Sequence, residues 1–257
     1  MIRGSSKQKQ ADQTRLISTH DPQPTIHAFA AIALSLLLAA APCGAGEAEW
    51  KMFHEQSAAH LQRGNLEQAE LFAREALREA DTALGERAVE LSLLRMAHVL
   101  RLRGKTEEAL PLALRAVKIS TRLHGADSPN TGIALQIQAE TQSARRQYAE
   151  AEALHLRALA IFQKAYGEKH FSTATSLHNV GAMLYAQDKN KEAEKYLRRA
   201  LAVKEQILKP GNLSIAHTLD QLAAVLDAQG RQIEGERYRK RAEGIRQRTQ
   251  APVKQGV

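Results

Sequence analysis

The chain is poor in the residues from which many functional sites are built. Among its 257 residues there is one cysteine, Cys43, and aromatic residues make up only 4%. A single cysteine excludes an intramolecular disulfide and any cysteine-pair metal or redox motif. No Gly-rich phosphate loop, His-Glu-x-x-His helix or nucleophile elbow occurs in the sequence. We therefore expect neither an enzyme nor a bound cofactor.

Ten histidines are present, but their spacing does not favour a metal site. No two of them stand three or four residues apart, which is the spacing that places two ligands on one face of a helix. Alternation of apolar and polar residues, as in a strand, is also missing over more than a few residues. The sequence thus predicts neither a metal centre nor a sheet.

What the sequence has in quantity is repetition. Small residues recur at Ala69, Ala109, Ala151, Ala193 and Gly235, at intervals of 40, 42, 42 and 42 residues. A second alanine follows each of these positions after seven residues. A fixed period of roughly 20–50 residues indicates stacked supersecondary units, none of which buries its apolar face alone.

Turn residues divide each repeat into two segments. Five residues before the first small residue stands a glycine, except in two repeats, where Arg146 and Asp188 occupy the slot. Between the turns, apolar residues such as Leu177, Val180 and Leu184 follow the spacing of one helical face. Each repeat is therefore predicted to be a pair of antiparallel helices, and the fold class to be all-α.

These residues resemble those of a known family. The segment 174–208, ATSLHNVGAMLYAQDKNKEAEKYLRRALAVKEQIL, resembles a tetratricopeptide repeat, and the 42-residue period with the linker YGEKHFSTA resembles the kinesin-light-chain subtype. That subtype joins its repeats by glycine, charged residues and His-Pro. Here His170 occupies the histidine slot of one linker and Pro129 the proline slot of the preceding one. The resemblance covers about residues 50–247 and implies a right-handed superhelical solenoid of about five repeats.

The N-terminal sequence is of a different kind. Residues 1–25 are basic and lack periodicity, so we expect a disordered leader. Residues 26–41 are an apolar run of 16, and small residues follow up to position 45. A helix of that length rises about 24 Å, less than the roughly 30 Å of a bilayer core. A cleaved signal at 26–45 is therefore favoured over a short membrane anchor, and export to the periplasm or the medium is expected.

The formal net charge of +8 is concentrated near the ends of the chain. Residues 231–257 carry eight basic and three acidic side chains, and the predicted solenoid at 46–247 is followed by a disordered basic tail at 248–257. The basic last helix either caps the solenoid with a polar face or docks onto an anionic membrane surface. Without an aromatic platform beside this charge, nucleic acid is not expected as a partner.

A column of arginines recurs just before the second alanine of successive repeats. Its members are Arg115, Arg157, Arg199 and Arg241. We expect these side chains to be solvated and to pair with acidic neighbours such as Glu192 and Glu194, rather than to bind a ligand.

The resemblance further implies that the first helix of each repeat lines a concave groove in which peptides or helices bind. The candidate partner-binding residues on that face are Arg95, His98, Arg101, Gln136, Glu140, His178, Asn179, Tyr185, His217, Asp220 and Gln221. A solvated helix face without a recognition role is the other interpretation. The groove is basic at one end and acidic at the other, which favours a ligand of mixed charge.

The sequence thus predicts a non-enzymatic scaffold or adaptor that binds an unidentified protein or peptide in its groove. The alternative is an accessory or assembly factor at the envelope surface that docks through its basic C-terminal helix. Binding would depend on groove residues in the first case and on salt and the residues 237–241 in the second.

Overall fold

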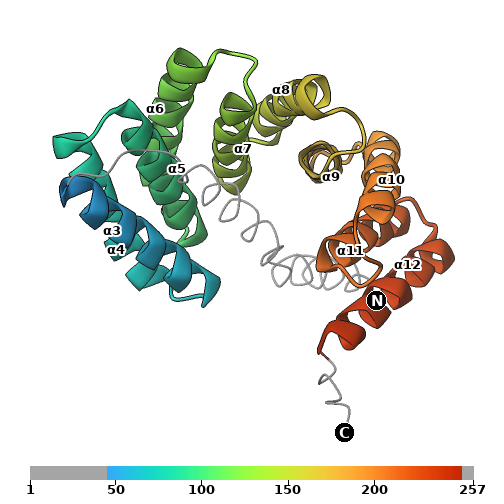
Figure 1. Ribbon diagram of the computed structural model, residues 1–257. Coiled ribbons are helices and arrows are strands. Elements are labelled where there is room, and N and C mark those ends of the chain that lie inside the picture. The colour runs from blue at the N-terminus through green and yellow to red at the C-terminus, as the bar shows by residue number, and fades with distance from the viewer. Residues whose placement is uncertain (1–44, 251–257) are drawn as a thin grey trace, which may run out of the picture.

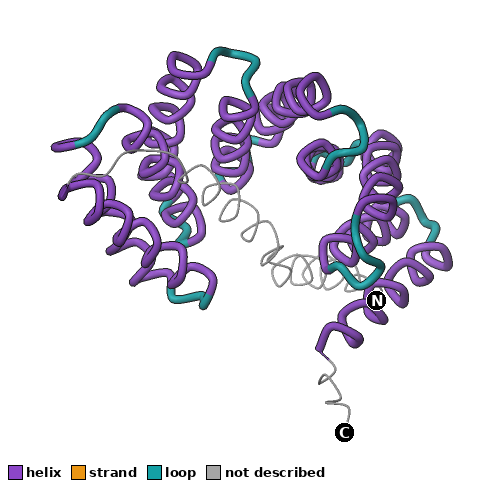
Figure 2. The backbone as a smooth tube through the Cα atoms, in the orientation of Figure 1, coloured by secondary structure: helices purple, strands orange, loops and turns teal. Residues whose placement is uncertain are grey.

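The computed structural model describes residues 45–250, which form ten α-helices and no strand (Figures 1 and 2). In chain order the helices are α3 (Ala45–Gln62), α4 (Leu66–Ala83), α5 (Glu86–Leu102), α6 (Thr106–His124), α7 (Pro129–Ala144), α8 (Tyr148–Tyr166), α9 (Phe171–Ala186), α10 (Asn190–Ile207), α11 (Leu213–Ala228) and α12 (Gln232–Gln250). The predicted leader, most of the predicted signal and residues 251–257 lie outside the described residues. Within residues 45–250, none of the helices combines the length and the apolarity that a membrane crossing requires.

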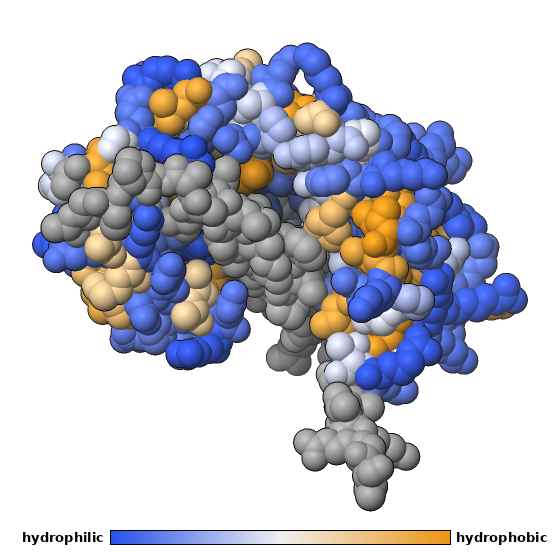
Figure 3. All heavy atoms as spheres, in the orientation of Figure 1, coloured by the Kyte–Doolittle hydropathy of each residue, from blue (hydrophilic) through white to orange (hydrophobic). Residues whose placement is uncertain are grey.

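The helices pair into five antiparallel hairpins, from α3–α4 to α11–α12, and each hairpin packs on the next. Figure 1 shows the hairpins stacked into an arc, with α5, α7, α9 and α11 on its inner side and α6, α8 and α10 on its outer side. The predicted all-α solenoid of five repeats is confirmed. In the view of Figure 3, hydrophilic residues cover most of the outer rim.

The turn within each hairpin has the same backbone geometry. Its central residue has a positive φ of 75° at Gly64, 75° at Gly104, 62° at Arg146, 59° at Asp188 and 79° at Gly230. Glycine adopts this left-handed conformation without steric cost, and a non-glycine residue does so at a cost. The register read from the sequence therefore identified the turn even where glycine is replaced.

Three of the four linkers between hairpins start the next helix with a side-chain cap, and the first, which ends at Gly85, does not. The Ser128 hydroxyl accepts a hydrogen bond from the Thr131 amide (3.2 Å), and Pro129 is the first residue of α7. His170 Nδ1 caps α9 in the same way, and the Asn212 amide oxygen caps α11. Both residues that carried the linker resemblance, Pro129 and His170, thus have a structural role at a helix start.

Small residues allow the helices to approach closely. All five alanines that follow the first small residue of a repeat by seven positions, from Ala76 to Ala242, are fully buried. At Gly181, a Cβ atom would lie 2.7 Å from Leu197 Cγ and 3.3 Å from the Ala193 carbonyl oxygen. These positions leave no room for a larger side chain, because the interior is already close-packed.

A second kind of contact holds each of the last two hairpins to the one before it. The Gln187 side-chain amide, just after α9, donates to Glu152 Oε2 (2.7 Å) and to the Tyr148 carbonyl (3.4 Å) on α8. Forty-two residues later, Gln229 donates to Glu194 Oε2 and to the Asn190 carbonyl, both at 3.0 Å. We call this pair of bonds the turn clasp.

The arginine column pairs across repeats rather than within one. Its ion pairs are Arg115–Asp81 (2.6 Å), Arg199–Glu168 (3.4 Å) and Arg241–Glu205 (2.6 Å). The expectation of ion-paired arginines is confirmed for these three, but Glu194 as a partner is wrong. Glu194 bonds instead to Arg198 (2.7 Å) and Arg231 (2.8 Å), because it faces the turn of the following hairpin.

Candidate partner-binding groove

The predicted groove residues all lie on the first helices of the second to fifth hairpins, which are α5, α7, α9 and α11. They are less accessible than a solvated helix face would be. Arg95, His98, Arg101 and Asn179 are buried, and the other members of the set are partly buried. The interpretation as a wet helix face is therefore wrong for these four residues, because their polar groups are withdrawn from water.

At the N-terminal end, polar side chains join α3 to α5. Trp50 Nε1 donates to Ser92 Oγ at 2.7 Å, and an Arg95 guanidinium nitrogen lies 3.2 Å from His54 Nε2. Burial, reinforced by the charge of Arg95, lowers the pKa of His54 to about 3. His54 is therefore neutral at physiological pH, and its Nε2 accepts the bond from Arg95.

An ion pair joins α5 to α7. Arg101 Nη2 lies 3.2 Å from Glu140 Oε2, and His98 Nδ1 lies 3.4 Å from the same guanidinium nitrogen. Burial raises the pKa of Glu140, and the charge of Arg101 opposes this effect. The predicted groove residues Arg101, Glu140 and His98 are thus brought together, and they contact one another instead of each extending alone into the groove.

Further along, Gln136 Nε2 on α7 donates to Ser176 Oγ on α9 at 3.1 Å. Each pair of neighbouring first helices is therefore linked by at least one polar bond. This polar seam follows the inner side of the arc from α3 to α11.

The seam ends at a buried lysine that the sequence analysis did not single out. Lys204 on α10 is 3% exposed, and its Nζ donates to Thr218 Oγ1 (2.8 Å) and to the Ser214 carbonyl (3.3 Å). Thr218 Oγ1 in turn lies 3.3 Å from His178 Nδ1. Burial lowers the pKa of Lys204 to about 7, so this ammonium is weakly held as a cation at neutral pH.

Three histidines surround this lysine. Burial lowers the pKa of His178 well below its usual value, and the charges of Lys204, His217 and His155 lower it further. His155 on α8 is 2% exposed, and burial lowers its pKa to about 3. His217 is only partly buried, and Asp220 partly offsets the lowering of its pKa by burial. At neutral pH these imidazoles are therefore uncharged, and Asp220, which the sequence analysis counted toward an acidic end of the groove, is ion-paired with Arg246.

The register contained a signal for Lys204. In three successive hairpins, the residue 14 positions after the start of the second helix is buried. These residues are Ser120, Phe162 and Lys204. A lysine 42 residues after a buried phenylalanine thus indicates a cation inside the solenoid. The sequence analysis overlooked it because only the first helices were searched for site residues.

Tyr185 does not project freely into the groove. Its ring packs against the large apolar cluster of α9 to α12, and burial raises its pKa, with Asp227 and Asp188 contributing. Gln221, by contrast, is partly buried on α11 and belongs to no apolar cluster. Tyr185 therefore contributes to packing as well as to the groove surface.

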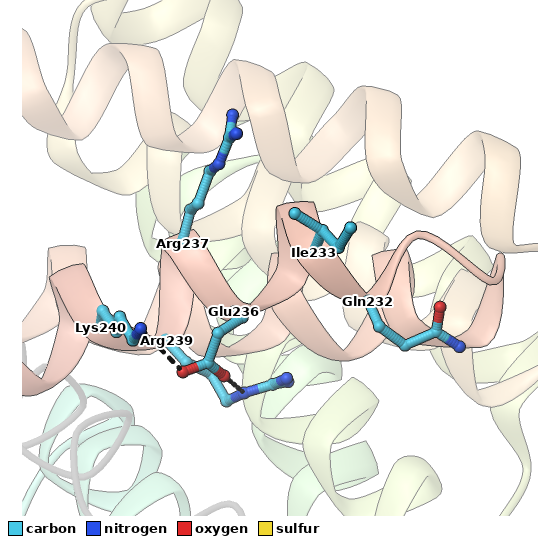
Figure 4. Close-up of a pocket in the computed structure, with 6 residues that line it drawn as sticks. All are labelled: Gln232, Ile233, Glu236, Arg237, Arg239 and Lys240. Atoms are coloured by element: carbon cyan, nitrogen blue, oxygen red, sulfur yellow. Dashed lines mark hydrogen bonds and ion pairs between the residues drawn. The ribbon is translucent and has the colours of Figure 1, made fainter.

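The basic last helix is largely neutralised by acidic partners. Arg239 pairs with Asp227, Arg241 with Glu205 and Arg246 with Asp220. A shallow depression on this helix is lined by Gln232, Ile233, Glu236, Arg237, Arg239 and Lys240 (Figure 4). None of the predicted groove residues lines it. Within residues 45–250, no group of three histidine, cysteine or acidic side chains is placed to hold a metal ion.

Comparison with known families finds the tetratricopeptide repeat model matching residues 89–164, 138–206 and 172–248. No curated protein matches the chain. The crystal structure of BtubC (BKLC) from P. vanneervenii is similar, with a TM-score of 0.65, 20% identity, and coverage of 91% of this chain and 96% of that one. The nearly identical TPR-like repeats of a Podosopora anserina kinesin light chain give a TM-score of 0.63 at 22% identity, covering 78% and 96%. A Rap protein complexed with competence and sporulation factor gives 0.67 at 16% identity, covering 94% and 72%.

Proposed function

Because the chain belongs to the tetratricopeptide repeat family, whose solenoids are scaffolds for protein interaction, we propose that it is a non-enzymatic adaptor that binds a partner segment on its concave face. The segment is an extended peptide or a helix, and it lies along α5, α7, α9 and α11. Binding there requires no cofactor.

One observation carries this proposal, and it comes from comparing equivalent positions of successive repeats. Leu93, Leu135, Leu177 and Leu219 are 42 residues apart, and each is fully buried. Two residues further on, the equivalent positions hold Arg95, Ile137, Asn179 and Gln221. Packing keeps the first column uniform, whereas the second column differs in chemistry from repeat to repeat. Arg95, Ile137 and Asn179 are buried and Gln221 is partly buried, so the inner face differs in chemistry from repeat to repeat at and just beneath its surface, as a face that recognises one particular ligand does.

The similar structures support the proposal by analogy. The Rap structure contains the competence and sporulation factor, so a solenoid of this shape holds a ligand in that protein. At 16% identity the likeness concerns the fold, and the nature of the ligand here follows from this chain's own side chains.

The alternative, docking of the C-terminal helix to an anionic surface, has weaker support. Its basic residues Arg239, Arg241 and Arg246 are engaged with acidic partners, so they have less charge to offer a membrane. Lys240 lies 3.8 Å from Glu236 on the same helix, and Arg237 and Lys240 are the side chains to test.

The deciding experiment is affinity capture from the native host, followed by variants of the recovered interaction. The double change Asn179→Ala with Gln221→Ala alters two equivalent groove positions and spares Tyr185, which packs on the core. We expect it to weaken binding at least about tenfold, equivalent to about 1.4 kcal/mol, because the partner's polar groups lose their hydrogen bonds. Because Asn179 is only 4% exposed, this double variant should melt somewhat earlier, whereas Gln221→Ala alone should keep the melting temperature and still weaken binding.

The matched control is Lys191→Ala with Lys195→Ala, two exposed positions at the start of α10. It should bind the partner as the unaltered protein does. If Arg237→Gln with Lys240→Gln abolishes capture while the groove double variant retains it, the adaptor function is wrong and surface docking replaces it.

We propose export as the setting of this function. The support is the basic leader, the apolar run at 26–41 and the small residues that end at position 45, which together have the composition of a secretory signal.

A further inference from the structure

Basic side chains from four successive helices meet at the C-terminal end of the polar seam. They are His155 on α8, His178 on α9, Lys204 on α10 and His217 on α11, and positive charge on any of the other three lowers the pKa of His178. Lys204 reaches His178 through Thr218, with contacts of 2.8 Å and 3.3 Å. We refer to these four residues as the basic cluster.

Little negative charge faces the basic cluster. Both described hydrogen bonds of Lys204 go to neutral oxygens, a hydroxyl and a carbonyl. Asp220, the acidic group that acts on His217, holds the Arg246 guanidinium in two contacts of 2.5 Å and 3.4 Å. Buried cations are normally paired with a carboxylate, so the protonated form of Lys204 lacks a counter-ion within this cluster.

A further polar atom is left without a partner. His155 is 2% exposed, and its Nδ1 makes no hydrogen bond to any residue in the described part of the chain. Buried polar atoms are satisfied in the great majority of cases, and an exception calls for an explanation. The cluster is open on one side, because His178 and His217 are only partly buried on the first helices that line the arc.

We infer that the basic cluster is a proton-linked anion site, in which an oxyanion group binds at His178 and His217 and is accompanied by uptake of protons from solvent. The anion supplies the missing counter-charge, and the protons convert neutral imidazoles into donors. Lys204, which is linked to His178 through Thr218, adds positive charge to the site.

Proton uptake follows from the same arrangement. Without an anion, a proton on His178 would place a second cation beside Lys204 in a dry environment, which is unfavourable. A bound oxyanion removes this penalty, so anion and proton favour each other. Linkage then requires anion affinity to rise as pH falls, by up to about tenfold per pH unit for each proton taken up.

The natural occupant is a carboxylate of the partner segment, and this part of the inference rests on the proposed function. His178 and His217 of the cluster lie on the same helices as Asn179 and Gln221, so an acidic residue of a peptide bound along these helices would reach them. The anion chemistry itself needs no partner and is tested with small anions.

The experiment uses the full chain with carbon-13-labelled histidine and sodium sulfate as the probe. Sulfate keeps its charge between pH 6.0 and 7.5, and sodium chloride holds the ionic strength constant. We expect the His178 and His217 ring signals to shift on titration, with the dissociation constant at least about fivefold lower at pH 6.0. Calorimetry in two buffers of different ionisation enthalpy should record protons taken up. Acetate tests whether the site accepts a carboxylate, and it should produce the same shifts. A response to sulfate but not to acetate would overturn the assignment of a carboxylate as the natural occupant.

His178→Asn should remove the part of the pH dependence that this imidazole contributes, and Lys204→Met should weaken sulfate binding at both pH values. His60→Asn, the same exchange in the first hairpin, is the control and should bind as the unaltered protein does. If His178→Asn has a lower melting temperature than the unaltered protein, the same sulfate titrations are made with His217→Asn. Equal sulfate affinity at both pH values, no binding to the unaltered protein, or unchanged binding in the variants would each overturn the inference. Partner capture that survives such a result would leave the proposed function standing.

Discussion

The buried ammonium of Lys204 allows a quantitative prediction about stability. Burial lowers its pKa from 10.5 to about 7 in the folded chain. The unfolded chain therefore binds more protons than the folded one between these two values, and stability rises with pH across that window. Below about pH 7 the folded chain carries nearly the full penalty of a buried charge, which corresponds to about 5 kcal/mol.

Replacing the lysine by methionine removes this penalty and keeps a side chain of similar length. The change also removes two hydrogen bonds, to Thr218 and to the Ser214 carbonyl, each contributing about 1 kcal/mol. We therefore expect Lys204→Met to be more stable than the unaltered protein by about 3 kcal/mol at pH 7. The difference should shrink by about 1.4 kcal/mol for each pH unit up to pH 9.

Urea unfolding followed by circular dichroism at pH 7, 8 and 9 measures these differences. Lys195→Met, an exposed lysine on the same helix, is the control and should give a flat difference over the same range. The description of Lys204 as a buried cation without a carboxylate partner would be refuted by either of two results. One is a difference in unfolding free energy between Lys204→Met and the unaltered protein that stays the same at all three pH values, and the other is a Lys204→Met variant that is less stable at pH 7.

Other predictions concern the helix contacts, the histidines and the leader. Ala193→Leu or Ala200→Leu should lower stability by about 1–3 kcal/mol through overpacking, whereas Ala186→Leu, at an exposed position, should cost little. Equal melting temperatures would contradict the register. His155→Leu should resist acid better than the unaltered protein between pH 6.5 and 4, because a histidine whose pKa is lowered to about 3 destabilises the fold as pH falls; identical acid unfolding curves would exclude this. N-terminal sequencing of protein from the native host should find a mature chain that begins near Gly46, and an intact leader would contradict export.

The fold was predictable because it depends on local, repeated signals. The turns at Arg146 and Asp188 were assigned from their register alone, and both have the left-handed backbone that glycine adopts elsewhere in the series. The alanine columns predicted close helix contact, and the alanines at the second position are fully buried. Such features repeat every 40 to 42 residues, and five copies of them supported the same interpretation.

The chemistry of the site was less predictable, because it depends on pairs of residues from different repeats. The sequence placed Arg101 and Glu140 on the inner face, but periodicity alone did not predict that they pair at 3.2 Å. Lys204 was overlooked for a related reason, since it lies on a second helix and enters the seam through Thr218 and the Ser214 carbonyl of the next hairpin. Contacts between neighbours in space thus supplied what spacing along the chain did not.

The turn clasps have a mechanical consequence. Each one ties a hairpin only to the hairpin before it, as Gln187 does with Glu152 and Gln229 with Glu194. A force that pulls the two ends of the arc apart would load these bonds in series, and small displacements at each junction would add up along the molecule. The solenoid would then behave as a soft spring, whose curvature adjusts to the length of what it holds while every hairpin stays intact.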